Sequence, residues 1–87
     1  MKVLNTKEIY NSNLPAEILT NVCAWFHEVS NGRWESVNDL NRHYPDCRLF
    51  DSKVFFPVAS STYLIVTCIN FSSEIVLILE IRENDQR

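Results

Sequence analysis

The stretch AWFHEVSNGRWESVNDL, residues 24–40, decides the fold of the first half of the chain. It holds the end of a predicted amphipathic helix over residues 15–30, in which apolar residues recur at spacings of three and four and therefore share one stripe. The stripe consists of Ile18, Leu19, Val22, Trp25, Phe26 and Val29. Asn31-Gly32 then predicts the end of the helix, because glycine readily adopts the left-handed conformation that follows many helices.

Two shorter helices are predicted on either side of this one. Residues 7–13 follow Asn5 and Thr6, either of which can cap the first turn with its side chain. Residues 37–43 follow Ser36, another favourable N-cap residue. The first half of the chain is therefore predicted to be helical.

Beyond residue 46 the hydrophobic period changes from about 3.6 residues to about 2, the period of a strand with one buried face. Strands are predicted over residues 47–50, 53–58, 63–71 and 75–81, and residues 2–4 are a further candidate. Pro57 cannot donate a hydrogen bond to a neighbouring strand, so its strand must be an edge there or end there. Short turns between consecutive strands predict an α+β fold, with the N-terminal helices packed on one face of an antiparallel sheet of three to four strands.

The size and charge of the chain limit the kinds of protein to which it can belong. With 87 residues, of which 46% are hydrophobic, residues 1–87 are expected to form a single domain. The net charge is −3, from 8 basic and 11 acidic residues, so nucleic acid would have to be held by a local basic cluster. No apolar run reaches the length of about 18 residues that suits a membrane span, and no secretory signal is visible, so a cytoplasmic protein without membrane contact is expected.

Three cysteines, Cys23, Cys47 and Cys68, are widely spaced. No C-x-x-C pair occurs, and no histidine stands at ligand spacing from a cysteine. The pattern indicates reduced, partly buried thiols. Neither a metal nor a cofactor is expected.

Several short motifs occur in a fixed order along most of the chain. They are Trp25-Phe26-His27-Glu28-Val29, Trp34, Ser36, Asp39-Leu40, Tyr44-Pro45, Val54-Phe55-Phe56-Pro57-Val58, Tyr63-Leu64-Ile65-Val66 and Ile69-Asn70-Phe71. In this order they resemble the HigB family of toxin–antitoxin ribonucleases, and the resemblance spans roughly Val3 to Glu83. It implies a RelE-like fold, an antitoxin partner and a metal-independent endoribonuclease (mRNA interferase) that cleaves mRNA, either free or on the ribosome.

The chain departs from this family at polar positions. The arginine that follows the family's tyrosine falls on Leu64, and the arginine of its last strand falls on Leu79. The family's Gly-Asn turn falls on Ala59-Ser60-Ser61, and its closing Gly-Thr-His-x-Glu-Tyr-Asp falls on residues 82–87 without the His or the Tyr. Cleaving RNA through its own 2′-hydroxyl requires a base, an acid and a cation beside the phosphate. These replacements therefore predict a large loss of cleavage unless other residues substitute.

Other charged and polar residues are candidates to replace the lost groups. The candidates for catalysis are Arg82, Glu80, Lys53 and Tyr63, and those for RNA binding are Arg33, Arg48 and His43. Arg33 could stack with RNA beside Trp34. Plainer interpretations exist, because charges at strand ends and edges, such as Arg82 and Lys53, are usually solvated. His43 likewise complements the dipole at the end of its helix.

Two functions remain open on this sequence. The first is a HigB-like toxin that cleaves mRNA, or has become inactive, and is held by an antitoxin. The second is a non-catalytic protein-binding module on the same scaffold. Leu64 and Leu79 favour the second function, as do the exposed aromatic residues expected at Phe50, Phe55 and Phe56. Apolar edge strands also make a homodimer a candidate assembly.

Overall fold

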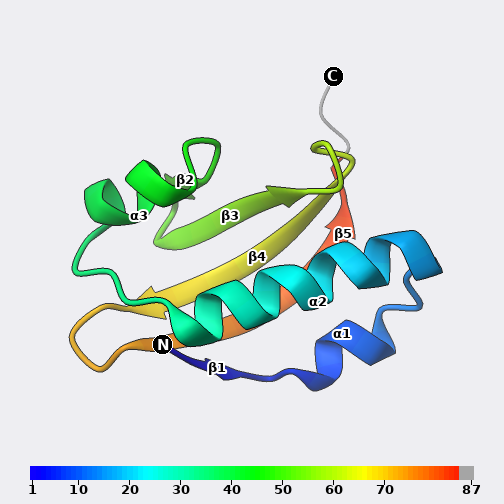
Figure 1. Ribbon diagram of the computed structural model, residues 1–87, viewed down its shortest axis with the longest axis horizontal. Coiled ribbons are helices and arrows are strands. Elements are labelled where there is room, and N and C mark those ends of the chain that lie inside the picture. The colour runs from blue at the N-terminus through cyan, green and yellow to red at the C-terminus, as the bar shows by residue number, and fades with distance from the viewer. Residues whose placement is uncertain (85–87) are drawn as a thin grey trace.

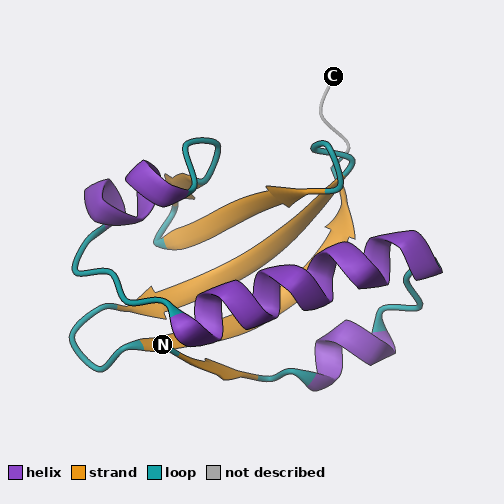
Figure 2. Cartoon of the chain, viewed as in Figure 1, coloured by secondary structure: helices purple, strands orange, loops and turns teal. Residues whose placement is uncertain are grey.

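Helices α1 and α2 lie on one face of a five-stranded sheet in the computed structural model, which describes residues 1–84 (Figure 1). The helices are α1 (Lys7–Asn11), α2 (Ala16–Asn31) and α3 (Val37–His43). The strands are β1 (Lys2–Leu4), β2 (Arg48–Phe50), β3 (Lys53–Val58), β4 (Tyr63–Asn70) and β5 (Ile75–Glu83). Figure 2 shows the long helix α2 lying along the sheet. The predicted α+β architecture of helices packed on a sheet is confirmed.

The sheet is mixed, with the strand order β1-β5-β4-β3-β2. Strands β2 to β5 form an antiparallel meander, as their short connections predicted. β1 pairs in parallel with β5, with Lys2 opposite Ile75 and Leu4 opposite Leu77. The prediction of a purely antiparallel sheet of three to four strands is therefore wrong in both respects. β1 and β5 lie at opposite ends of the sequence, and parallel pairing is not made by a tight turn, so no local signal specifies it.

The core lies between α2 and the sheet. The predicted stripe of α2 is confirmed: Ile18, Val22, Trp25 and Val29 are buried, and Leu19 and Phe26 are partly buried against the core. The ring centroid of Trp25 lies 5.3 Å from that of Phe56, which is only 1% exposed. The expectation that Phe56 is an exposed aromatic is therefore wrong. Phe56 shares the inward side of β3 with Val54, whereas Phe55 points to the other side.

Residues other than glycine make the turns of the sheet, because the chain has one glycine. Asp51 and Ser52, between β2 and β3, have φ of 53° and 64°, the signs that a type I′ turn requires, and the predicted hairpin is confirmed. Ala59, Ser60 and Ser61, between β3 and β4, have φ of 52°, 57° and 68°. A left-handed backbone costs a residue with a Cβ about 1–2 kcal/mol, so this loop is strained where the family resemblance places Gly-Asn.

Gly32 follows α2 because a side chain there would collide with a neighbouring ring, and not because the backbone needs a positive φ. Its φ and ψ are −95° and 167°, an extended conformation, so the left-handed cap predicted here is wrong. The ring of Trp34 instead covers Gly32. A Cβ at Gly32 would meet Cη2 of Trp34 and would lie 2.7 Å from its Cζ2 and 2.8 Å from its Cζ3. The buried indole therefore requires a glycine at this position.

Replacing Gly32 with Ala is expected to lower the free energy of unfolding by about 1–3 kcal/mol, the usual cost of overpacking a filled core. The new methyl group must push the ring of Trp34 against those of His43 and Tyr44, whose centroids lie 5.7 and 5.9 Å from it. Urea unfolding followed by tryptophan fluorescence measures the change. Asn38→Ala, at an exposed position of α3, is the control and should stay within about 0.5 kcal/mol. Equal stability of the Gly32→Ala protein and the unsubstituted one would contradict the steric role.

Candidate functional site

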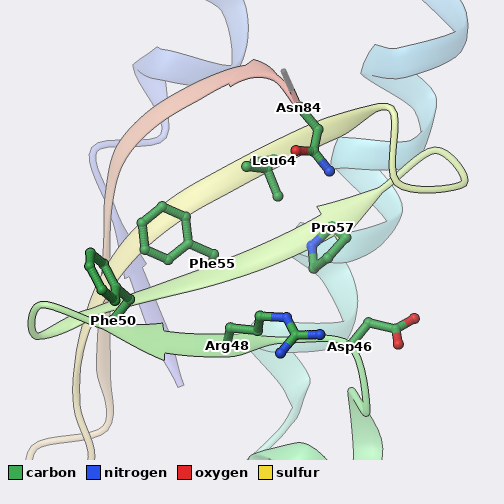
Figure 3. A pocket seen from close by; sticks show the side chains of 7 residues that line it. All are labelled: Asp46, Arg48, Phe50, Phe55, Pro57, Leu64 and Asn84. Carbon is green, nitrogen blue, oxygen red and sulfur yellow. The ribbon is translucent and has the colours of Figure 1, made fainter. Parts of the chain in front are cut away.

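The face of the sheet that α1 and α2 leave uncovered, called the open face below, carries a groove beside β2, β3 and β4 (Figure 3). The groove has a volume of about 340 Å³ and is lined by Asp46, Arg48, Phe50, Phe55, Pro57, Leu64 and Asn84. Figure 3 shows these side chains on one side of the sheet, with α2 behind it. Alternation along each strand explains the grouping, because residues two apart share a face.

A gap in the sheet shapes this groove. β2 is three residues long and begins at Arg48, opposite Phe55 of β3. Pro57 lies beyond the start of β2, so β3 has no strand beside it there except β4 on the other side. The predicted edge position of Pro57 is confirmed. Because Pro57 has no N–H, it leaves no unpaired donor at this edge.

The groove has an apolar floor and polar rims. The floor is formed by Phe55, Pro57 and Leu64. Arg48 and Asp46 stand along the β2 side, and Asn84 stands at the opposite side, at the end of β5 (Figure 3). Two hydrogen bonds hold Asn84 there: its Nδ2 donates to the carbonyl oxygen of Ser61, and its backbone N–H donates to that of Thr62, both at 2.9 Å.

Two arginines of the open face differ in their surroundings. Nε of Arg82 lies 3.7 Å from Oε2 of Glu80. Both side chains are about half exposed, so the pair contributes at most about 1 kcal/mol to stability. Arg48 takes part in no ion pair within residues 1–84. A guanidinium that has no ion-pair partner among the described residues and lies beside an apolar floor suits a ligand group that is flat or aliphatic and carries a negative charge.

Four of the predicted site residues lie on the open face: Arg48, Lys53, Glu80 and Arg82. Arg82 is opposite Leu64 across the β4–β5 ladder, which places it beside the groove. Lys53 shares its face of β3 with Phe55. Of the four, Arg48 lines the groove itself.

Tyr63 and Arg33 do not lie with these four residues on the open face. Tyr63 packs against the core on the helix side of β4, because it alternates with Leu64. Nη2 of Arg33 lies 3.6 Å from Oε2 of Glu74, at the start of β5. About 23 Å of strand separates Ile75, the first residue of β5, from Arg82, so Arg33 and Arg82 cannot contact the same phosphate.

His43 belongs to a cluster of aromatic rings at the end of α3. Its ring centroid lies 5.7 Å from that of Trp34 and 4.8 Å from that of Tyr44. Oη of Tyr44 donates to Oε1 of Glu28 on α2 at 2.7 Å. Burial, followed by this hydrogen bond, raises the pKa of Tyr44 above its ordinary value, so the phenol stays protonated at neutral pH. The cluster thus joins α3 to α2, and His43 and Tyr44 line a second pocket that shares Asp46 and Pro57 with the groove.

The three cysteines are free thiols, and none of them lines the groove. Burial, followed by the charge of Asp46, raises the pKa of the Cys47 thiol, so little of its reactive thiolate is present at neutral pH. Within residues 1–84, no three side chains of His, Cys, Asp or Glu gather as metal ligands would. In that same part of the chain the longest helix has 16 residues, and none is long and apolar enough to cross a membrane.

Sequence reasoning missed Asp46 and Asn84 as residues of the site. Nothing in the sequence marks Asp46, because its place follows from where β2 begins. A signal did exist for Asn84: the family's closing Gly-Thr-His begins at Arg82, so its histidine falls on Asn84. The family's arginine position, Leu64, also lies in the groove. Leu79, the other arginine position, is the extra residue of a β-bulge in β5 and does not line the groove.

A comparison with known families identifies the family of this chain. The family model HigB_toxin, described as the RelE-like toxic component of a toxin–antitoxin system, matches residues 19–84. The matched segment runs from α2 to the end of the described residues and includes every residue of the groove. No curated protein matches the chain.

Proposed function

This chain belongs to the HigB toxin family, the RelE-like toxic component of toxin–antitoxin systems, and from this premise we propose that it binds partners through its open face but cleaves RNA weakly or not at all. Membership of this family implies an antitoxin as a partner. The protein would then act by binding its partners and would leave mRNA uncleaved. Compared with its family, the protein would keep the scaffold and the capacity to bind an antitoxin but would have fewer catalytic charges.

The groove lacks two groups that cleavage of RNA would use. Leu64 and Asn84, which stand where the family resemblance places an arginine and a histidine, both line the groove. A leucine cannot stabilise the charge that grows on a phosphate, and an amide cannot transfer a proton at neutral pH. Arg82, the nearest strand residue to Leu64 across the ladder, is already paired with Glu80. The groove therefore favours binding over cleavage.

The second candidate function is an active endoribonuclease built from substitute residues. The guanidinium of Arg48 in the groove favours it, because a cation there can contact a phosphate. Arg82 and Lys53 on the same face could add charge, and Glu80 could take a proton once separated from Arg82. This candidate requires the RNA to break the Glu80–Arg82 pair, a small cost for an exposed pair.

Expression without an antitoxin distinguishes the two functions. We expect a host that makes this protein alone to keep growing, and an mRNA translated in a cell-free system to stay full-length when the purified protein is added. The 5′ ends of the mRNA, mapped by primer extension, report any cleavage. Growth arrest with new 5′ ends that Arg48→Ala abolishes, and that Arg33→Ala leaves unchanged, would establish the endoribonuclease and overturn the binding proposal. Arg33 is the matched control because it lies far from the groove, beside Glu74.

A further inference from the structure

The outer edge of β2 is an unpaired strand edge. β2 is the last strand of the sheet, and all three of its residues are exposed. Leu49 is 54% exposed and Phe50 is 73% exposed. Natural proteins usually protect sheet edges with charges, prolines or covering loops, because an apolar edge pairs readily with another chain. β2 has Arg48 as its only charged residue, so its edge is weakly protected.

The peptide groups of Leu49 point toward this free edge. Phe50 and Lys53 flank the two-residue turn of the hairpin, so they form a hydrogen-bonded pair of the ladder. Such pairs alternate with non-hydrogen-bonded ones, and Leu49 opposite Val54 is therefore of the second kind. The N–H and C=O of Leu49 consequently face away from β3. Within residues 1–84 neither group has a hydrogen-bond partner.

The residues on either side of Leu49 limit what can pair with it. The backbone N–H of Cys47 already donates to the carbonyl oxygen of Tyr44 at 3.1 Å, and Nδ2 of Asn41 donates to the carbonyl oxygen of Cys47 at 3.0 Å. Asp51 is in the turn, with φ of 53°. A long strand from an unrelated protein would therefore gain few bonds here beyond those of Leu49. Two antiparallel copies of β2 that pair at Leu49 need only the hydrogen bonds of the two Leu49 peptide groups.

We propose that two copies of this chain associate through β2, antiparallel about a twofold axis at Leu49. Each Leu49 would donate its N–H to the C=O of the other, and the two exposed leucine side chains would meet. In the same register Arg48 of each copy lies opposite Phe50 of the other, on the open face. A guanidinium over an aromatic face is attracted by the quadrupole of the ring, so the edge is complementary to itself.

This association would also change the groove. A twofold axis perpendicular to an antiparallel sheet keeps the open faces of both copies on the same side. Phe50 forms one end of the groove (Figure 3), so the partner's Arg48 would come to lie beside that end. The dimer would then carry two adjoining grooves on one continuous sheet. This inference goes beyond the proposed function and does not depend on whether RNA is cleaved.

A symmetric disulfide tests the register directly. Opposed residues of a hydrogen-bonded antiparallel pair have Cα atoms about 5.5 Å apart, within the range of roughly 4.4–6.8 Å that a disulfide spans. Leu49→Cys is therefore expected to form a disulfide-linked dimer under mild oxidation, seen on a non-reducing gel. Leu4→Cys, on the edge strand β1 at the other side of the sheet, is the matched control and should not. Linkage of both variants to the same extent, or of neither, would overturn the register.

Sedimentation of the unsubstituted protein tests whether two copies associate. The apparent mass should rise from 10.2 kDa toward twice that value as concentration increases. Leu49→Pro removes an N–H that the monomer fold does not use, so it should stay folded by circular dichroism and monomeric. Arg48→Ala should weaken association about 5- to 30-fold, because the twofold axis makes the substitution remove two exposed cation–π contacts from each dimer. A protein that stays monomeric up to about 10⁻³ M, beyond the range of even weak transient pairs, would overturn the proposal.

Discussion

Replacing Leu64 with Arg and Asn84 with His together is expected to raise the rate of mRNA cleavage by more than about 10²- to 10³-fold, because one preorganised charge at a reacting centre has about that effect by itself and the histidine adds proton transfer. Both side chains line the same groove. An arginine at position 64 would lie between Pro57 of β3 and Arg82 of β5, which are its neighbours across the two ladders. Together with Arg48 it would place cationic groups on two sides of a bound phosphate.

The histidine supplies the second missing function. Its ordinary pKa lies near neutral, so it can give or take a proton where an amide cannot. The substitution removes the hydrogen bond from Nδ2 of Asn84 to Ser61, a loss of about 1 kcal/mol, but keeps the backbone bond to Thr62. The loop between β3 and β4 should therefore remain in place.

The measurement is the rate at which full-length mRNA disappears in a translating cell-free system. Leu64→Arg alone and Asn84→His alone should each give less than the pair. Tyr10→Arg adds the same charge at a 71% exposed position of α1, far from the groove, and should leave the rate unchanged. If the double variant cleaves no faster than the unsubstituted protein, loss of these two groups is not what weakens catalysis.

Phe56→Ala is expected to lower the free energy of unfolding by about 3–5 kcal/mol. The ring is 1% exposed and packs edge to face against Trp25 and Tyr44, with centroids 5.3 Å away in both cases. Its removal leaves a cavity between β3 and α2 and deprives both rings of a partner. A small domain has about 5–15 kcal/mol of stability, so this variant should be close to unfolded at moderate temperature.

Phe50→Ala is the matched control for that experiment. It makes the same substitution on the neighbouring strand, but Phe50 is 73% exposed. Its effect should stay within about 0.5 kcal/mol. Thermal unfolding followed by circular dichroism compares the two variants with the unsubstituted protein. Similar midpoints for Phe56→Ala and Phe50→Ala would contradict the burial of Phe56 in the core.

Local patterns predicted much of the helical and hairpin structure. The stripe of α2 was sufficient because spacings of three and four have one regular solution, a helix with one buried face. Ser36 predicted the start of α3, and its Oγ does accept from the backbone N–H of Asp39 at 3.2 Å. The Asp51-Ser52 turn set the register of β2 on β3, since a two-residue loop allows few alternatives.

The candidate site was predicted only in part. Arg48, Lys53, Glu80 and Arg82 do share the open face. Tyr63 was grouped with them although it alternates with Leu64 and packs on the helix side. The error has a simple source: alternation within one strand gives two faces, but not which of them meets the helices.

The amino-acid sequence by itself determined the elements, the order of the meander and the family, because each depends on residues close together in the chain or on motifs in a fixed order. Only the tertiary structure decided which of Phe55 and Phe56 is buried, that β1 joins β5 in parallel, and that Gly32 makes room for Trp34. It also decided that Leu64 and Asn84 lie in one groove. These features depend on how distant segments meet, and the packing of a whole core selects among arrangements that local propensities leave nearly equal.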